Sequence, residues 1–228
     1  MDSPFVSILL PSLLVVPAMG LLSSIRSESA IGAELKRKAL HVGVGVAALT
    51  FPLLLETPAA TLGALGLVVA WMVLVRRIPA LNRRFGCVLR DAGRRSSGEI
   101  FFAIAIAALL LLPRGDFAGY AIPVLILTCS DALAAIVGRA LPFGRLSGLA
   151  AGKTVSGSMA FLLSAFLITA GLTISSTSLD LVSAISIGAV VAVSTCVMEA
   201  ISRRGTDNLT IPLIAWAILF VALPGASS

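Results

Sequence analysis

The sequence has few charged residues for its length. Asp, Glu, Lys and Arg make up 12% of the 228 residues, whereas hydrophobic residues make up 58%. An ordinary soluble domain carries about a quarter charged residues. The shortage of charge excludes a soluble globular domain and predicts a single integral membrane domain that covers residues 1–228.

The sequence also lacks the features of several other protein classes. Its three cysteines show no metal-like CxxC spacing, so they are predicted to be small apolar fillers. It contains no internal repeat and no low-complexity segment. The first residues, Met1-Asp2-Ser3, include no basic side chain, so the first hydrophobic stretch is expected to be a retained helix and not a cleaved signal peptide.

Long hydrophobic stretches are what the sequence has instead. A helix needs close to 20 mostly apolar residues to cross a hydrocarbon layer of roughly 30 Å. Eight stretches approach this length: 4–24, 39–55, 58–75, 99–113, 118–138, 155–175, 181–201 and 208–224. The sequence therefore predicts an all-α polytopic membrane helix bundle with about eight transmembrane helices, or seven as the alternative.

Positive charge is distributed unevenly between these stretches. Sixteen of the seventeen Lys and Arg residues fall in alternate gaps, and only Arg114 falls in the others. Because short basic loops stay on the cytoplasmic side of a membrane, we expect the four basic loops inside and both termini outside. The net charge of +6 then follows from topology and from attraction to anionic lipids, so no nucleic acid partner is expected. The pattern fits a prokaryotic plasma membrane, with an organellar membrane as the alternative.

Polar residues at the predicted cytoplasmic rim of the spans are the candidate functional groups. Such groups cost several kcal/mol in a membrane unless they are paired or hydrated. They are Glu34, His41, Glu99, Asp131, Glu199 and Asp207. A transporter typically places its binding groups near the bilayer midplane and shows internal repeats. The one-sided arrangement instead favours an enzyme that acts on a lipid headgroup with a water-soluble co-substrate.

The start of the second stretch presents a polar stripe. Glu34, Lys38 and His41 follow one another at helical spacing, and Arg37 borders them. Taken alone, Arg37 and Lys38 are better explained as a simple anchor whose side chains reach the lipid headgroups. His41 lies a turn deeper than these cations, where it can bind a phosphate or act as an acid or base.

The loop 76–98 has two different halves. Its first half is explained by an amphipathic segment that lies on anionic lipid. In its second half, Ser97 and Gly98 present backbone N–H groups at the start of a helix, where the dipole favours an anion. Glu99 is then either an ordinary acid of a first helical turn or a metal ligand.

Asp131 and the loop that follows its helix form another candidate site. Asp131 lies about two turns from the end of the fifth stretch, on a face of small residues. The loop from Pro142 to Ser158 is rich in Gly, basic residues and hydroxyls, as phosphate-binding loops are. Gly152-Lys153-Thr154 is not a Walker A motif, because Ser147 stands where the motif needs a glycine and a membrane helix precedes the loop.

Oxygen ligands also occur around the last basic gap. Glu199 ends the seventh stretch and Asp207-Asn208 opens the eighth. Asp207 or Thr206 equally fits the N-cap of a helix. With Asp131, these residues supply the carboxylate and amide oxygens that Mg²⁺ prefers.

Taken in order, these motifs resemble the family of phytol kinases, dolichol kinases and CTP-dependent diacylglycerol kinases. The resemblance covers about residues 34–212 and rests on Glu34-x-x-Arg37-Lys38-x-x-His41, Ser97-Gly98-Glu99, Asp131-x-x-Ala134-x-x-x-Gly138-Arg139 with Gly144, Lys153-Thr154-x-x-Gly157-Ser158, and Glu199 with Asp207-Asn208. The short chain is most similar to the phytol and farnesol kinase branch. Ser156 departs from the pattern, because many relatives have an acidic residue or Ala there.

The resemblance implies transfer of the terminal phosphate of CTP or UTP to a membrane isoprenoid alcohol, with Mg²⁺ or Mn²⁺. Diacylglycerol phosphorylation and CMP transfer of the phosphatidate cytidylyltransferase kind are the enzymatic alternatives, and a lipid transporter or flippase is the non-enzymatic one. Catalysis is expected from Asp131, His41 and Lys153, with Asp131 or His41 as the base, and metal binding from Asp131, Glu199, Asp207 and Asn208. The residues expected to bind nucleotide or phosphate are Arg37, Lys38, Ser97, Gly98, Gly138, Arg139, Gly144, Arg145, Lys153, Thr154, Gly157 and Ser158. The oligomeric state stays open.

Overall fold

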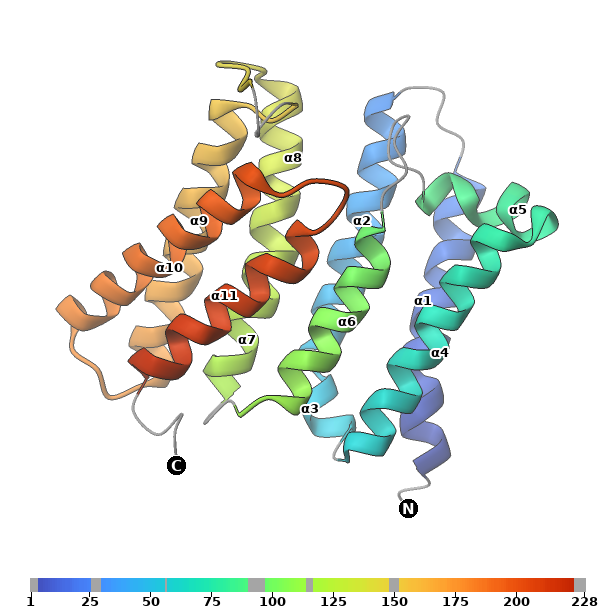
Figure 1. Ribbon diagram of the computed structural model, residues 1–228, viewed down its shortest axis with the longest axis horizontal. Coiled ribbons are helices and arrows are strands. Elements are labelled where there is room, and N and C mark those ends of the chain that lie inside the picture. Colours follow the sequence, from blue (N-terminus) through green and yellow to red (C-terminus); the bar gives the residue numbers. More distant parts are fainter. Residues whose placement is uncertain are drawn as a thin grey trace. The chain divides into compact units, whose positions relative to one another are not determined.

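The computed structural model describes residues 4–25, 30–55, 57–89, 97–113, 117–147 and 152–223, which form helices and no strand. The elements are α1 (Pro4–Ser24), α2 (Ala30–Ala48), α3 (Phe51–Leu54), α4 (Pro58–Arg77), α5 (Pro79–Leu89), α6 (Gly98–Leu111), α7 (Phe117–Leu125), the π-helix η1 (Ile126–Ser130), α8 (Asp131–Ala140), α9 (Val155–Ser176), α10 (Leu181–Ile201) and α11 (Asp207–Ala222). Figure 1 traces them along the chain. The all-α membrane helix bundle expected from the sequence is confirmed.

Each of the eight hydrophobic stretches contains helix. Four helices are long and apolar enough to cross a membrane, namely Pro58–Arg77, the continuous α7–η1–α8 rod Phe117–Ala140, Val155–Ser176 and Leu181–Ile201. Shorter apolar helices are Pro11–Ser24, Gly98–Leu111 and Asp207–Ala222. The second stretch, 39–55, is not one continuous helix: α2 ends at Ala48 and α3 begins at Phe51. Pro52 explains the break, because proline has no N–H to continue the hydrogen bonds of α2.

The helices form two compact units, Met1–Leu111 and Leu112–Ser228. In the N-terminal unit, α1, α2 and α4 share a core around the fully buried Met19 and Val75. The expected amphipathic segment is α5, whose Phe85 packs against Trp71 with 5.7 Å between ring centroids. Arg83 and Arg84 lie exposed on the same helix. α5 therefore has one apolar face on the unit and one basic face turned away from it.

In the C-terminal unit, the α7–η1–α8 rod packs against α9 and α11, and α10 packs against α9 and α11 (Figure 1). Its core contains Ile126, Phe161, Val191 and Ile211, all fully buried. Pro123 lies inside α7, and the π-helix follows it directly, before α8 begins at Asp131. Such π-helical turns are rare and often mark functional sites. Here the turn directly precedes Asp131, the first residue of α8.

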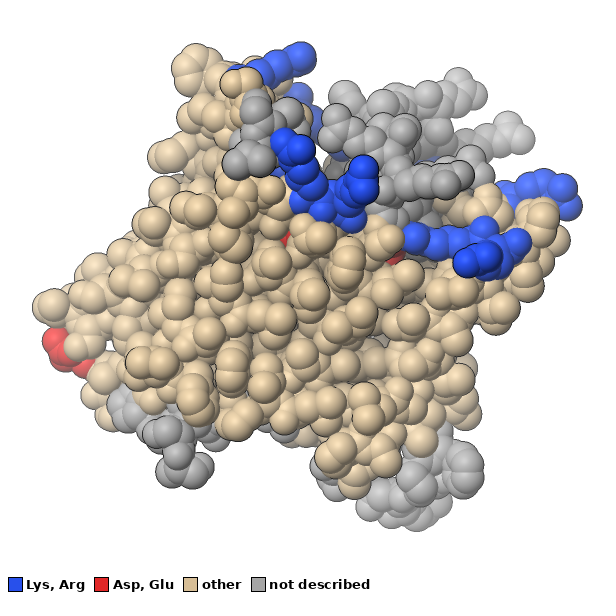
Figure 2. Space-filling model, in the orientation of Figure 1, with Lys and Arg blue, Asp and Glu red and all other residues tan. Residues whose placement is uncertain are grey.

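Charged side chains of the C-terminal unit gather at one end of its helices. The described Lys and Arg residues all lie near the end of α8 or α10, or in the segments that lead into α9 and α11; they are Arg139, Arg145, Lys153, Arg203 and Arg204. Figure 2 shows Lys and Arg atoms in blue and a broad surface of uncharged residues in tan. Asp180, which begins α10 at the opposite end, is exposed. We refer to the end that carries these five residues as the basic end of the C-terminal unit.

Candidate functional site

The segment before α9 is folded as a short hairpin that fixes the backbone of Lys153. Arg145 and Thr154 form an isolated antiparallel bridge. The Leu146 N–H donates to the Lys153 carbonyl at 3.0 Å, and the Val155 N–H donates to the Gly144 carbonyl at 2.9 Å. Gly144 has φ +64°, and a Cβ there would lie 2.7 Å from Cγ2 of Val155. Only glycine therefore fits this turn without strain.

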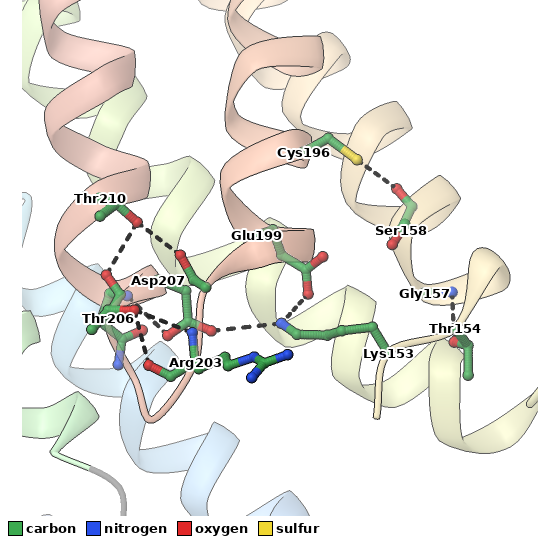
Figure 3. A network of polar contacts seen from close by, with 12 residues as sticks. Lys153, Thr154, Gly157, Ser158, Cys196, Glu199, Arg203, Thr206, Asp207 and Thr210 are labelled. Atoms are coloured by element: carbon green, nitrogen blue, oxygen red, sulfur yellow. Dashed lines mark hydrogen bonds and ion pairs between the residues drawn. The ribbon is translucent and has the colours of Figure 1, made fainter. Parts of the chain in front are cut away.

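The Lys153 side chain reaches from this hairpin to two other elements. Its ammonium pairs with Oε1 of Glu199 on α10 and lies 3.6 Å from Oδ2 of Asp207 at the start of α11 (Figure 3). Burial acts to lower the pKa of Lys153, but the charges of Glu199, Asp207 and Asp131 raise it by more, so the pKa stands above its ordinary value. Lys153 is consequently a fixed positive charge at neutral pH.

The acidic partners of Lys153 come from three separate helices. Glu199 is 3% exposed and Asp131 is 7% exposed. Asp207 is less buried, with 18% of its side chain accessible. Carboxylates this deep are costly unless a cation faces them.

The turn before α11 determines which groups the Asp207 carboxylate contacts. Arg204 and Gly205 both adopt positive φ, 56° and 88°, and reverse the chain. Thr206 is the N-cap residue of α11, but its hydroxyl bonds Arg203 and not the helix. Asp207 is thus not the N-cap that the sequence allowed. Its Oδ1 accepts the Asn208 N–H at 3.1 Å, and Oδ2 faces Lys153.

Two predicted phosphate-binding glycines have a packing role in this structure. A Cβ on Gly157 would lie 2.8 Å from the Ala134 carbonyl and 3.3 Å from Cα of Gly138. A Cβ on Gly138 would lie 2.7 Å from Oγ1 of Thr154. Thr154 itself caps α9, because its hydroxyl accepts the Gly157 N–H at 3.1 Å. These three residues bring α8 and α9 into close contact and so set the position of Asp131 relative to Lys153.

The N-terminal unit contains a second polar group. Glu99 in the first turn of α6 pairs with Arg76 at the end of α4, and Arg37 is a further electrostatic neighbour. His41 packs edge-on against Phe102 with 4.9 Å between ring centroids. Arg76 was not among the expected site residues. The sequence did contain a signal for its pairing with Glu99, because Arg76 lies at the end of one hydrophobic helix and Glu99 at the start of the next.

The remaining predicted residues lie as follows. Lys38 on α2 is buried, at 4% exposure, and Asn208 on α11 is buried at 5%. Ser97 accepts the N–H groups of Ile100 and Phe101 through its carbonyl, and Gly98 begins α6. Arg139 and Arg145 are exposed at the basic end. Glu34 lies in α2, but its side chain is outside the described part of the structure. The C-terminal unit thus brings together Asp131, Lys153, Glu199 and Asp207 of the predicted set.

Comparison with known proteins identifies a relative of this chain. A phytol kinase from Synechocystis sp. (strain ATCC 27184 / PCC 6803 / Kazusa) is 32% identical over 196 residues, which cover 81% of this chain and 79% of that protein. No family model and no solved structure matches the chain. Because the identity extends over most of both proteins, the chain belongs to the phytol kinase family.

Proposed function

We propose that this chain is a membrane kinase that transfers the terminal phosphate of CTP or UTP to the hydroxyl of an isoprenoid alcohol such as phytol, geranylgeraniol or farnesol. Its relationship to a phytol kinase supports the reaction class. The observation that carries the assignment of the site is the Lys153 ammonium, which a hairpin holds among carboxylates from three helices.

The charges of the cluster suit phosphoryl transfer. Such a reaction needs positioning and neutralisation of phosphate charge more than covalent chemistry. Lys153 is a permanent cation, and Arg139 and Arg145 are accessible from solution near the same hairpin. These three residues would hold the triphosphate.

The donor set around Lys153 fits a magnesium ion. Asp131, Glu199, Asp207 and the Asn208 amide offer only oxygen ligands, which a hard divalent cation prefers. Within the described residues, no three His, Cys, Asp or Glu side chains are grouped closely enough to hold a metal by themselves. This agrees with the usual magnesium site, in which one or two carboxylates act together with substrate phosphates. When bound, the ion would neutralise charge on the phosphates; Mn²⁺ is the expected substitute.

The orientation of the site follows from the distribution of charge. Lys153 and its partners lie at the basic end of the C-terminal unit. The positive-inside rule places that end in the cytoplasm, where nucleotides are available. The lipid alcohol would reach the same end from within the bilayer, and a prokaryotic plasma membrane is the proposed location.

The direct test is phosphate transfer by the purified protein in detergent with Mg²⁺. Radiolabelled CTP, UTP, ATP and GTP are each combined with phytol, geranylgeraniol, farnesol, dolichol or diacylglycerol. We expect label in an isoprenyl phosphate with CTP or UTP as donor. Label in diacylglycerol alone would change the acceptor class, and no transfer from folded protein would overturn the assignment.

Two substitutions connect that activity to the described site. Asp131→Asn and Lys153→Ala should each abolish transfer while the protein still inserts and purifies as a folded species. Asp180→Asn is the control, because Asp180 is exposed at the opposite end of α10. If both site variants transfer phosphate as fast as the wild type, Asp131 and Lys153 have no part in catalysis.

A further inference from the structure

Two buried oxygens beside the Lys153 cluster have no hydrogen-bond partner among the described residues. They are Oε2 of Glu199 and Oγ of Ser158. The other oxygen of the same carboxylate, Oε1, is the one that Lys153 occupies. Leaving a buried polar atom without a partner costs about 1–3 kcal/mol, and more for a charged group. The described residues contain seven such buried side-chain atoms, and these two are the ones on α9 and α10 next to Lys153.

The two oxygens belong to one interface, between α9 and α10. Cys196 contacts the Ser158 carbonyl, with 3.4 Å between Sγ and the oxygen. Cys196 and Glu199 are three residues apart on α10 and so share a face of the helix. The face that carries Glu199 is therefore the one that meets α9 at Ser158. Figure 3 shows both side chains between these helices, with Lys153 on the other side of the Glu199 carboxylate.

Ser158 and Glu199 lie at the depth in the helices where the polar head of a membrane lipid would be found. Ser158 is the fourth residue of α9, and Glu199 is the third from the end of α10. Both thus lie within about one turn, roughly 5 Å, of the basic end of their helices. Phosphates would approach from the Lys153 side, whereas a lipid would approach along the helices.

The hydrogen-bonding properties of the two oxygens also restrict which group can bind them. An ionised carboxylate oxygen only accepts hydrogen bonds, and a serine hydroxyl can donate one. An alcohol hydroxyl donates one hydrogen bond and accepts others, so its chemistry matches both a carboxylate oxygen and a serine hydroxyl. A phosphate or another carboxylate would be repelled by Glu199 and would satisfy only Ser158.

We propose that Ser158 and Glu199 bind the hydroxyl group of the acceptor lipid alcohol, which donates to Oε2 of Glu199 and accepts from Oγ of Ser158. The inference rests on the proposed kinase function and adds the place of its second substrate. Glu199 then connects the two halves of the reaction: one oxygen faces the Lys153 cluster and the other holds the acceptor. Ser158, expected from the sequence to bind nucleotide, becomes a residue of the acceptor site.

The test compares Ser158→Ala with Ser164→Ala on the same helix. Ser164 is the matched control, because its hydroxyl already donates to the carbonyls of Ala160 and Phe161 at 2.7 and 3.0 Å. Loss of one hydrogen bond predicts a rise of about five- to tenfold in the KM for geranylgeraniol in Ser158→Ala. The KM for CTP should stay unchanged, and both constants should stay unchanged in Ser164→Ala.

A binding measurement without nucleotide gives a second readout. Wild-type protein should bind geranylgeraniol more tightly than the hydrocarbon of the same chain that lacks the hydroxyl, and Ser158→Ala should lose about the same five- to tenfold preference. The proposed acceptor site is wrong if the wild-type enzyme is active and Ser158→Ala has the same KM for geranylgeraniol. It is also wrong if only the KM for CTP rises in Ser158→Ala. In both cases the kinase assignment stands. If the wild type phosphorylates no alcohol, the kinase assignment fails, and the hydroxyl preference alone decides the inference.

Discussion

At the scale of single residues, Lys153 is the centre of the C-terminal site. Its ammonium faces Glu199 and Asp207, and Asp131 contributes to its raised pKa. The same carboxylates are the proposed magnesium ligands. If these carboxylates bind magnesium as proposed, the ammonium and the divalent cation would compete for one set of oxygens.

The competition predicts an effect of Lys153→Met that is independent of catalysis. Two unit charges about 4 Å apart interact by roughly 4 kcal/mol at an effective dielectric constant of about 20. Removing the ammonium should therefore strengthen nucleotide-free Mn²⁺ binding by about tenfold or more, measured by electron paramagnetic resonance of the free ion. Phosphate transfer should be lost in the same variant.

Arg204→Gln provides the control for a mere change of net charge. Arg204 is exposed in the turn before α11 and carries the same charge. Its substitution should change Mn²⁺ affinity by less than about twofold, because exposed charges are screened by solvent. Equal affinities for Mn²⁺ in Lys153→Met and wild-type protein would show that the ammonium and the metal do not share these carboxylates.

At the scale of secondary-structure elements, the crossing of α8 and α9 depends on a glycine pair. Gly157 lies so close to α8 that a Cβ would approach the Ala134 carbonyl to 2.8 Å. Backbone atoms cannot rotate away as a side chain can. A methyl group at this position has to push the two helices apart, and Asp131 and Lys153 move with them.

Gly157→Ala should therefore lower both the stability of the protein and its phosphate transfer. Overpacking of this kind costs about 1–3 kcal/mol, which thermal unfolding in detergent will detect, and phosphate transfer should fall with it. Gly171→Ala on the same helix is the matched control, because no atom lies within 4 Å of a Cβ there. That change should be neutral or slightly stabilising, since Ala favours helix over Gly. Comparable melting temperatures for both variants would refute the proposed crossing.

Helices α4 and α6 of the N-terminal unit are connected by the pair of Arg76 and Glu99. The side chains are 29% and 16% exposed, so the pair is partly withdrawn from water. Arg76→Gln leaves the carboxylate without its main partner and should cost about 1–3 kcal/mol of stability. The adjacent Arg77→Gln should have little effect, because Arg77 is exposed at the end of α4. Equal losses in both would mean that the pair contributes nothing beyond surface charge.

The elements also show what the sequence can and cannot predict. Apolar runs predicted the four helices of the described residues that are long and apolar enough to cross a membrane, because hydropathy is a local property. The π-helix after Pro123 and the hairpin that presents Lys153 were not predicted, since each depends on hydrogen bonds between particular backbone groups. Gly138 and Gly157 were expected to bind phosphate, which stays a prediction, and the structure shows in addition that both pack closely between helices. Sequence alone does not distinguish a small residue that admits a ligand from one that admits a helix.

At the scale of the whole molecule, the sequence identified the charged groups within the helices but not which of them contact one another. The cost of charge in a membrane singled out Asp131, Glu199 and Asp207 one by one. Which of them meets Lys153 depends on contacts across 46 positions of sequence, and only the packing of α9, α10 and α11 reveals it. Residues 34–41 and 97–99 belong to the N-terminal unit, and their part in binding nucleotide stays a prediction.

The orientation of the molecule supplies the last prediction. The basic end of the C-terminal unit should face the cytoplasm and the α9–α10 turn the opposite side, because translocation of Lys and Arg is disfavoured. In a variant without native cysteines, Ser178→Cys in that exposed turn should react with a membrane-impermeant maleimide in intact cells. Arg204→Cys should react only after the membrane is opened. The reverse labelling pattern would separate the Lys153 cluster from cytoplasmic nucleotide, and the kinase would then lack access to its phosphate donor.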